Sequence, residues 1–263
     1  MDGRFAGRNV IVTGAGRGIG EATALAFAAE GADVLALGRT VADLDDTVRQ
    51  ITEAGGRAWR AACDVTDEAA VDAAVADAAR RWGAIHVLIN NAGIDDDTPF
   101  LDIDRARWRA VIDTNLTGAF LMAQAVARQM ARTGGGVILH TASVDASGAD
   151  GPYAAYNSSK AALLGLNRTM AVELAQYGIR SNCVSPGFTH TAMTEQAVGP
   201  GLMSYLNGSF ARVPLRRLVR TDEVAQAFLY LASDQASGVT GIDLRVDAGL
   251  TANLFILETL PEE

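Results

Sequence analysis

The sequence predicts an α/β fold built on a doubly wound parallel sheet of about seven strands with helices on both faces. Short runs rich in Val, Ile and Leu recur along the chain, and stretches with helical spacing separate them. Several of these runs are apolar throughout rather than alternating, which is typical of strands covered on both faces. Alternating strands and helices of this length predict right-handed crossovers between parallel strands. The expected strands are residues 9–13, 33–37, 57–63, 86–90, 136–141, 179–185 and 242–246.

The stretches between the strands carry the apolar spacing of amphipathic helices. The first expected helix is the apolar run from Ala22 to Ala29. The next two begin after Thr40 and after Thr66, residues of a type that caps helix N-termini, and acidic side chains follow Thr66 in the first turn. The expected buried stripes are Leu44, Val48 and Ile51 in the earlier helix and Val71, Val75, Ala78 and Trp82 in the later one.

Two segments near the end of the chain do not fit this alternation. The stretch from Gly187 to Pro214 is too long and too rich in Gly and Thr for a tight connection, so a substrate lid is expected at about residues 188–213. The tail over residues 250–263 follows the last strand. Its apolar side chains are expected to dock on a neighbouring subunit, because a free apolar tail would be exposed; they are Leu254, Phe255, Ile256 and Leu257.

Composition indicates one globular domain over residues 1–263, with 49% apolar and 20% charged residues. A net charge of −9 argues against nucleic acid or an anionic membrane as a partner and favours a small-molecule role. The N-terminus lacks an apolar stretch of signal-peptide length and no later segment has about 18 uninterrupted apolar residues, so a cytoplasmic location is expected. The Cys and His residues show no metal-ligand spacing, and no metal site is expected; they are Cys63, Cys183, His86, His140 and His190.

A glycine-rich turn, TGAGRGIG, joins the first strand to the first helix. Gly14 allows the sharp turn, Gly18 with Ile19 brings the backbone close to a pyrophosphate, and Gly20 permits close packing of helix on strand. An ordinary tight turn is the alternative for such a cluster alone. Its position between strand and helix favours a dinucleotide site.

The end of the second strand indicates which dinucleotide is bound. It reads LALGRT, so Arg39 stands where a carboxylate would accept hydrogen bonds from a free ribose 2′-hydroxyl. Arg17 lies in the phosphate turn, and two guanidinium groups converging on a 2′-phosphate favour NADP(H) over NAD(H). The alternative is that both arginines are solvated surface residues. Asp64, with Val65, follows the third strand where it meets the adenine amine, and Asn91 and Gly93 of NNAG border the cofactor after the fourth.

Lys160 is the only lysine of the chain, and it follows Tyr156 by four positions. On a helix these two side chains project from one face as neighbours. A free phenol with a pKa of about 10 is a poor base at neutral pH, but an adjacent ammonium and a nearby oxidised nicotinamide favour the phenolate. Tyr156 can then move a proton to or from an alcohol oxygen. Lys160 lowers the pKa of that phenol and offers a compact head to a ribose hydroxyl, a place that a planar guanidinium fits less well.

Two further polar residues have both structural and functional interpretations. Ser143 follows the fifth strand, where its hydroxyl can hold the substrate oxygen, although a serine there is more often a turn or cap residue. Asn115 lies in an otherwise apolar helical stretch, so its side chain must find hydrogen-bond partners. It is therefore either a satisfied structural kink or the holder of a water molecule.

Together these motifs resemble the short-chain dehydrogenase/reductase family over essentially the whole chain. They are TGAGRGIG, CDV, NNAG, the Asn of DTNLTG, the Ser of TASV, YNSSK and SPGFTHT. The resemblance implies a single Rossmann-type domain in which Tyr156 is the acid/base, Lys160 binds ribose, Ser143 orients the substrate oxygen and Asn115 anchors a water-linked proton relay. It also implies cofactor contacts at the segment after the sixth strand, which includes Pro186, Gly187, Thr189 and Thr191, with Thr191 at the nicotinamide carboxamide. Relatives are usually homotetramers, so a homotetramer or homodimer pairing the helices that begin near Arg105 and Ala154 is implied.

The chain departs from the family pattern at three positions outside the catalytic set. Thr189 stands where an aliphatic residue is usual, and Arg216 and Ala248 each replace a frequent Gly. These differences bear on the lid and on the packing near the C-terminus.

The expected reaction is hydride transfer between nicotinamide and the carbon of a secondary alcohol or ketone. Acidic residues flanking the catalytic strand ends favour a polyol, sugar-like or amino-alcohol substrate, with a solvated acidic loop as the alternative; they are Asp95, Asp96, Asp97, Asp145 and Asp150. Arginines of the later loop instead fit an anionic substrate, or more simply a surface face; they are Arg212, Arg216, Arg217 and Arg220. The competing functions are a noncatalytic dinucleotide-binding regulator and an NAD(H)-preferring dehydrogenase of a hydrophobic alcohol. A cofactor-retaining sugar-nucleotide epimerase or dehydratase would share the Tyr and Lys, but such relatives are longer and use a different glycine spacing.

Overall fold

A computed structural model of the chain describes residues 3–149, 151–191, 194–195, 200–208 and 210–253. Seven strands form one sheet in the order β3-β2-β1-β4-β5-β6-β7, and every neighbouring pair is parallel. The predicted doubly wound parallel sheet is confirmed. The strands are β1 (Asn9–Thr13), β2 (Asp33–Gly38), β3 (Arg57–Ala62), β4 (Val87–Asn90), β5 (Gly136–Thr141), β6 (Ile179–Pro186) and β7 (Asp243–Val246).

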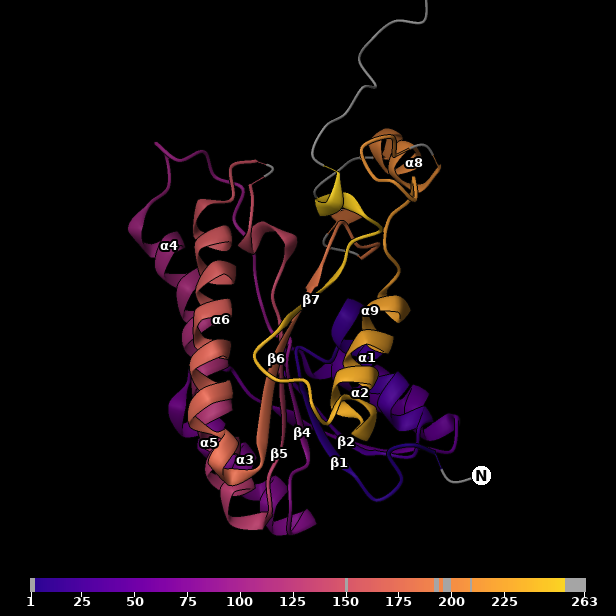
Figure 1. Cartoon of the computed structure of the whole chain (residues 1–263), viewed down its shortest axis with the longest axis vertical. Helices are drawn as coiled ribbons and strands as arrows, with labels where there is room; N and C mark the ends of the chain where they lie inside the picture. Colours follow the sequence, from indigo (N-terminus) through magenta and orange to yellow (C-terminus); the bar gives the residue numbers. More distant parts are fainter. Residues whose placement is uncertain (1–2, 150, 192–193, 196–199, 209, 254–263) are drawn as a thin grey trace, which may run out of the picture.

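Helices cover both faces of the sheet (Figure 1). One face carries α1 (Gly18–Ala29), α2 (Val41–Glu53) and α9 (Thr221–Ala232). The other carries α3 (Glu68–Trp82), α4 (Arg105–Ile112), α5 (Gly118–Thr133) and α6 (Ala154–Glu173). Strand order reverses between β1 and β4, so the loops after these two strands diverge and open a crevice at the carboxyl edge of the sheet.

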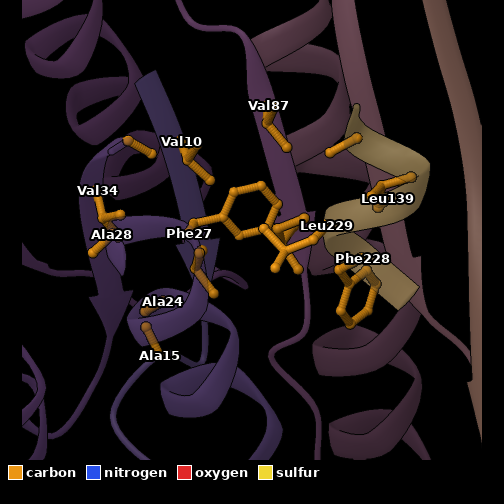
Figure 2. Packing of buried hydrophobic residues seen from close by; sticks show 14 of the residues in the cluster. Val10, Ala15, Ala24, Phe27, Ala28, Val34, Val87, Leu139, Phe228 and Leu229 are labelled. Carbon is orange, nitrogen blue, oxygen red and sulfur yellow. The ribbon is translucent and has the colours of Figure 1, made fainter. Parts of the chain in front are cut away.

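The apolar residues of the central strands are fully buried, which explains why their sequence runs do not alternate. On the first face, Phe27 of α1 and Leu229 of α9 lie beside each other against Val10 and Val87 of the sheet (Figure 2). On the second face, Met122 and other residues of α5 pack on the sheet together with α3. These two cores hold the strand ends in fixed positions.

The helix starts differ in detail from the sequence expectation. α1 begins at Gly18, four residues before the apolar run from which the helix was predicted. Asp67, not Thr66, caps α3, and its Oδ1 accepts a hydrogen bond from the Ala70 N–H at 3.1 Å. Thr66 instead donates its hydroxyl to Asp64 Oδ1 at 2.8 Å. The carboxylate is the stronger acceptor, so it takes the capping role that a threonine alone would fill.

The segment expected to form a lid contains α8 (Pro200–Gly208) among its described residues. A small apolar cluster of its own, separate from the two cores of the sheet, supports this region; its buried members are Leu206, Phe210, Val213 and Leu218. The ring of Phe188, just after β6, packs edge-on against Phe210 with 5.5 Å between centroids. The expected apolar tail, residues 254–257, lies outside the described residues.

Short turns complete the described chain. They are the π-helical turn η1 (Asp113–Thr117) and the 3-10 turns η2 (Val144–Ala146), η3 (Ala175–Tyr177), η4 (Asp234–Ala236) and η5 (Leu250–Ala252). By length and composition, the continuous helical run over residues 105–133 passes a test for a membrane-crossing helix. A buried core helix passes the same test. Met122, Val126 and Met130 of this run lie in the hydrophobic core.

Candidate active site

A cavity of about 410 Å³ opens at the carboxyl edge of the sheet, where β1 and β4 diverge. Turns after six of the strands contribute to its lining. The predicted site residues that line it are Gly14, Arg17, Gly18, Ile19, Arg39, Asp64, Val65, Asn91, Gly93, Ser143, Tyr156, Lys160, Pro186, Gly187, Thr189 and Thr191. Gly20 and Asn115 lie behind the lining. Residues from 14 to 191 are thus brought to one hollow.

The glycine turn has the backbone geometry that its residues require. Gly14 and Gly18 have φ angles of 62° and 60°, in the left-handed region that favours glycine. A Cβ on Gly20 would lie 2.1 Å from the Gly14 carbonyl oxygen, so only glycine allows this approach of helix to strand. Arg17, at the N-cap of α1, offers no side-chain cap to the first turn. The first N–H groups of α1 face the cavity lining at Gly18, a place that suits a phosphate.

Asn91 ties together the ends of three strands beneath this turn. Its Nδ2 donates to the carbonyl oxygens of Thr13 and Gly14 at 3.2 and 3.3 Å, and its Oδ1 accepts the Thr141 hydroxyl proton at 3.1 Å. The Thr13 hydroxyl in turn accepts from the backbone N–H groups of Asn91 and Ala92. Asn91 therefore holds the shape of the glycine turn as well as lining the cavity.

Arginine and carboxylate groups meet at the end of the cavity formed by β2 and β3. Arg39 Nη1 lies 3.8 Å from Asp64 Oδ2, and both side chains are substantially exposed. Hydrogen bonds from Thr66 lower the pKa of Asp64, with a smaller contribution from Arg39. Asp43, in the first turn of α2, also lines this end beside Gly16. Sequence reasoning gave no role to Asp43, because the fold alone brings the start of α2 to the glycine turn.

The α6 helix presents Tyr156 and Lys160 on one face. The Lys160 amine lies 5.4 Å from the centroid of the Tyr156 ring and donates a hydrogen bond to the Thr141 carbonyl oxygen at 2.7 Å. Lys160 is buried, and this burial lowers the pKa of its amine to about 8. A Cβ at Gly93 would stand 3.6 Å from the amine nitrogen. The lysine head therefore occupies a confined place between β5, α6 and the turn after β4.

Asn115 is a satisfied structural kink in the described structure. The helix widens to a π turn at η1 (Asp113–Thr117), which is a frequent feature of functional sites. Asn115 Oδ1 accepts from the Ile94 N–H at 2.8 Å, while Nδ2 donates to the Ile94 carbonyl at 2.8 Å and to the Ser159 hydroxyl at 3.0 Å. These bonds fix the turn after β4 against α6. Both N–H donors of the side-chain amide are used by the protein, so a relay water would have to donate to Oδ1 or bind a backbone group of this turn.

Ser143 and Asp145 form a hydrogen-bonded pair that the sequence did not reveal. Ser143 caps the 3-10 turn η2 by accepting from the Asp145 N–H at 3.1 Å, and its hydroxyl donates to Asp145 Oδ2 at 3.2 Å. Ser143 is buried, Asp145 is half-buried, and both line the cavity. The Ser143 hydroxyl thus caps η2 and is also the group proposed to contact the substrate.

The acidic residues expected at the rim divide into two groups. Asp95 and Asp145 line the cavity. Asp96 turns instead to Thr98 and to Arg107, whose Nη1 lies 3.5 Å from its Oδ1, and the hydrogen bonds from Thr98 lower the pKa of Asp96. Asp97 is exposed and outside the lining, and Asp150 lies outside the described residues.

Two of the four arginines of the later loop make surface ion pairs. Arg217 and Arg220 pair with Glu223 and Asp222 at the start of α9, and the Arg217 hydrogen bonds lower the pKa of Glu223 to about 2. Along the described chain, none of the four arginines considered for an anionic substrate lines the cavity. The surface interpretation is the one that the described contacts support.

The chain is similar to known oxidoreductases over nearly its full length. A family model described as enoyl-(acyl carrier protein) reductase matches residues 14–251. The chain is 40% identical to the cis-4-hydroxycyclohexanecarboxylate dehydrogenase of Sinomonas cyclohexanicum, with 96% of this chain and 100% of the relative covered. It is 35% identical to the D-threitol dehydrogenase of Mycolicibacterium smegmatis, with 95% of each covered. A solved structure described as a short-chain dehydrogenase/reductase from Burkholderia xenovorans matches with a TM-score of 0.90 at 37% identity, covering 96% of this chain and 100% of that one.

Proposed function

The chain belongs to the short-chain dehydrogenase/reductase family, and we propose that it transfers hydride between NADP(H) and the oxygen-bearing carbon of a neutral polyol, sugar-like or amino-alcohol substrate. Dependence on a nicotinamide dinucleotide and action on an alcohol or ketone follow from the family. The preference for NADP(H), the substrate class and the residue roles are our proposals. The observation that carries them is the confined Lys160 amine beside the Tyr156 ring, in the same cavity as the glycine turn.

The residues of the cavity fit a bound dinucleotide. The first turn of α1 and the glycine backbone would hold the pyrophosphate, Asp64 and Val65 the adenine, Lys160 a ribose hydroxyl, and the segment from Pro186 to Thr191 the nicotinamide amide. When bound, the nicotinamide accepts the hydride in alcohol oxidation or delivers it in ketone reduction.

The protein itself handles the proton of the substrate oxygen. In the oxidation direction, the Tyr156 phenolate takes the hydroxyl proton as the carbon loses hydride and the C–O bond becomes a carbonyl. The ammonium of Lys160 stabilises the phenolate, and the Ser143 hydroxyl donates to the substrate oxygen as negative charge develops on it. Asn115 holds the turn after β4 in place and would anchor the relay that returns the proton to water.

The proposed preference for NADP(H) is supported by Arg17 and Arg39, which both line the cavity at the end where a 2′-phosphate would lie. Asp64 is 3.8 Å from Arg39, and Asp43 is nearby, so the arginines partly neutralise carboxylates as well. A phosphate carries more charge than a single carboxylate and accepts a bidentate guanidinium. We therefore expect Arg39 to prefer the phosphate when it is present.

The proposed polar substrate is supported by Asp95 and Asp145, the two lining carboxylates that follow β4 and β5. Carboxylates accept hydrogen bonds from hydroxyl or ammonium groups and disfavour anions and bulky apolar groups. The relative from Mycolicibacterium smegmatis is named for a polyol, which is in keeping with this proposal.

We also propose that the protein is a cytoplasmic homotetramer or homodimer. Exposed apolar side chains lie on α4, α5 and α6, the helices that relatives pair; they are Trp108, Phe120 and Val172. Light scattering coupled to gel filtration would give the subunit number directly, and a monomer at micromolar concentration would contradict this assembly.

The function is tested by titrating NADPH and NADH separately and then assaying a substrate panel with the tighter cofactor. We expect tighter binding of NADPH and turnover of uncharged polyols, sugars or amino alcohols. Preference for NADH would refute the cofactor proposal, and preference for bulky hydrophobic ketones would refute the polar-substrate proposal. Binding of the dinucleotide without turnover of any alcohol or ketone would favour a regulator instead.

A further inference from the structure

The Ser143–Asp145 pair uses the one proton that Ser143 can donate. The Ser143 oxygen accepts the Asp145 N–H at 3.1 Å and gives its own proton to Asp145 Oδ2 at 3.2 Å. A serine hydroxyl has a single O–H to donate. In this arrangement the hydroxyl can still accept a hydrogen bond, but it donates to the carboxylate and not to a substrate oxygen.

The carboxylate is not required by the turn that contains it. The cap of η2 is made by the Asp145 backbone N–H, and any residue other than proline at position 145 would supply that group. The side chain adds a second bond, to the Ser143 hydroxyl, and it lies in the cavity lining. The backbone cap of η2 therefore does not depend on the acid at position 145.

A substrate must replace what Asp145 loses when Ser143 turns to the reacting oxygen. Donation from Ser143 to the substrate oxygen removes one hydrogen bond from a half-buried carboxylate, and losing a hydrogen bond to a charged acceptor costs free energy. A substrate with its own hydrogen-bond donor close to the reacting oxygen can donate to Asp145 in place of Ser143. A substrate without one leaves Ser143 held by the carboxylate.

The spacing of the two protein oxygens indicates where that donor must lie. Ser143 Oγ and Asp145 Oδ2 are 3.2 Å apart. Two oxygens on adjacent carbons in a gauche arrangement lie at about 3 Å, the length of an ordinary O–H···O contact. The reacting oxygen can thus face Ser143 while the neighbouring hydroxyl donates to Asp145.

The charge of Asp145 also acts on the catalytic amine. The Asp145 carboxylate favours the protonated form of the buried Lys160 amine and so raises its pKa, opposing the larger effect of burial. Asp145 lines the same cavity as Lys160 and contacts Ser143, so it can act on a substrate held there. Asp95, another carboxylate of the lining, makes no hydrogen bond with Ser143 within the described residues.

We propose that Asp145 selects substrates that carry a hydroxyl or amino donor on the carbon next to the reacting carbon, by accepting that donor in exchange for the Ser143 proton. The inference rests on the proposed oxidoreductase function and assigns its substrate class. It makes Asp145 a specificity residue of the same site.

A matched set of alcohols tests the exchange. Butane-2,3-diol, 3-methoxybutan-2-ol and butan-2-ol share the reacting group with the same configuration, and the methoxy compound keeps the second oxygen but removes its proton. We expect wild-type kcat/KM for the diol to exceed that for the methoxy compound by about 10- to 100-fold, the range for a hydrogen bond to a charged acceptor. In Asp145→Ala the ratio should fall to about 1, because the diol and the methoxy compound then differ by no contact with a carboxylate at this position. Asp145→Asn, which keeps a neutral acceptor, should give an intermediate ratio.

A binding measurement separates recognition from turnover. In the Tyr156→Phe protein with oxidised cofactor bound, calorimetry should show the same preference for the diol, and Asp145→Ala in that background should remove it. Asp97→Asn is the matched control, because it removes the same charge from an exposed position outside the lining and should leave the ratio unchanged.

Four outcomes would overturn the proposal. A wild-type ratio near 1 would mean that the neighbouring donor is not recognised. An unchanged high ratio in Asp145→Ala would place its recognition elsewhere, and an equal loss with all three alcohols would make Asp145 a support of the Ser143 turn only. Absence of turnover with any alcohol or ketone, despite cofactor binding, would refute the proposed function itself and this inference with it.

Discussion

The Lys160 amine stands 5.4 Å from the centroid of the Tyr156 ring while it donates to the Thr141 carbonyl of the neighbouring strand. One helical turn separates the two residues in sequence, and β5 supplies the acceptor that directs the amine. The ion is therefore held between α6 and the sheet and does not sample solvent. Such an arrangement gives the phenol a cationic neighbour in the cofactor cavity at pH values below the amine's pKa of about 8.

Replacement of Tyr156 by Phe should abolish proton transfer with little effect on cofactor binding. The ring and its packing against Tyr153 are kept, and only the phenolic oxygen is lost. Loss of a general acid/base lowers turnover by about 100-fold or more. Steady-state kinetics measures the loss, and a dissociation constant for NADPH within about threefold of wild type is the control. Undiminished turnover would show that another group moves the proton.

Replacement of Lys160 by Arg should impair the enzyme severely although the positive charge remains. The amine fits between the Thr141 carbonyl and Gly93, where a Cβ would already lie 3.6 Å from it. A guanidinium is wider and planar, so it must displace the turn after β4 or leave the Thr141 carbonyl without its donor. Turnover and thermal stability should both fall. Wild-type turnover in this variant would show that charge alone is needed.

Replacement of Arg39 by Asp should shift cofactor preference from NADPH toward NADH. The change removes a phosphate partner and adds an acceptor for a 2′-hydroxyl near Asp64. The ratio of the NADPH and NADH dissociation constants should change by about tenfold or more, as expected for a hydrogen bond to a charged group. Arg80→Asp, an exposed site on α3, is the matched control and should leave the ratio unchanged.

The sequence predicted the sheet well because the central strands are covered on both faces. The stretches between the strands also have clear helical periods. All seven expected strands lie within two residues of those observed. The residues around the cavity were also predictable, since the glycine turn, NNAG and the Tyr–Lys spacing each follow a strand or lie on a helix face. The fold then gathers them at one edge.

Contacts between side chains distant in sequence were not predictable. Asn115 hydrogen-bonds with Ile94 and Ser159 from within a π turn. A π turn has no characteristic spacing of apolar residues by which the sequence could predict it. The bond between Ser143 and Asp145 is local, but a Ser two residues before an Asp forms many different turns. Only the described backbone of η2 shows which of these turns is present.

Arg216 and Ala248, the two residues at frequent glycine positions, have positive φ angles of 55° and 54°. A residue with a Cβ in this backbone conformation destabilises the folded protein by about 1–2 kcal/mol. Glycine removes that strain, but its more flexible unfolded chain offsets about 0.5–1 kcal/mol of the gain. Arg216 is exposed, so Arg216→Gly should raise the free energy of unfolding by about 0.5–1 kcal/mol.

Ala248 differs because its methyl group packs against both neighbouring apolar clusters. Loss of one buried carbon costs about 0.8 kcal/mol, so Ala248→Gly should be close to neutral. Urea denaturation measures both variants. Arg212→Gly, an exposed change without a positive φ, is the control and should not stabilise the protein. Equal stabilisation at positions 212 and 216 would show that backbone conformation is not the cause.

His140 should make the protein less stable as the pH falls from about 6.5 to about 4. The ring is fully buried in β5, and this burial, with a smaller contribution from the Lys160 charge, lowers its pKa from 6.5 to about 4. Between those values the unfolded chain binds a proton that the folded protein does not, so acidification favours unfolding. One pKa unit corresponds to about 1.4 kcal/mol, and the histidine contribution at pH 5 should be a loss of about 2 kcal/mol relative to pH 7.5.

The contribution of His140 is isolated by comparing pH dependences. Urea denaturation at pH 7.5 and pH 5 gives the difference in unfolding free energy for the wild type and for His140→Gln, whose side chain does not titrate. The difference should shrink by about 2 kcal/mol in the variant even if its absolute stability is lower. His190→Gln, the same change at an exposed ring paired with Glu195, should retain the wild-type difference. An equal pH dependence in the wild type and His140→Gln would mean that the buried ring is protonated in the folded protein or that its surroundings open to water before it titrates.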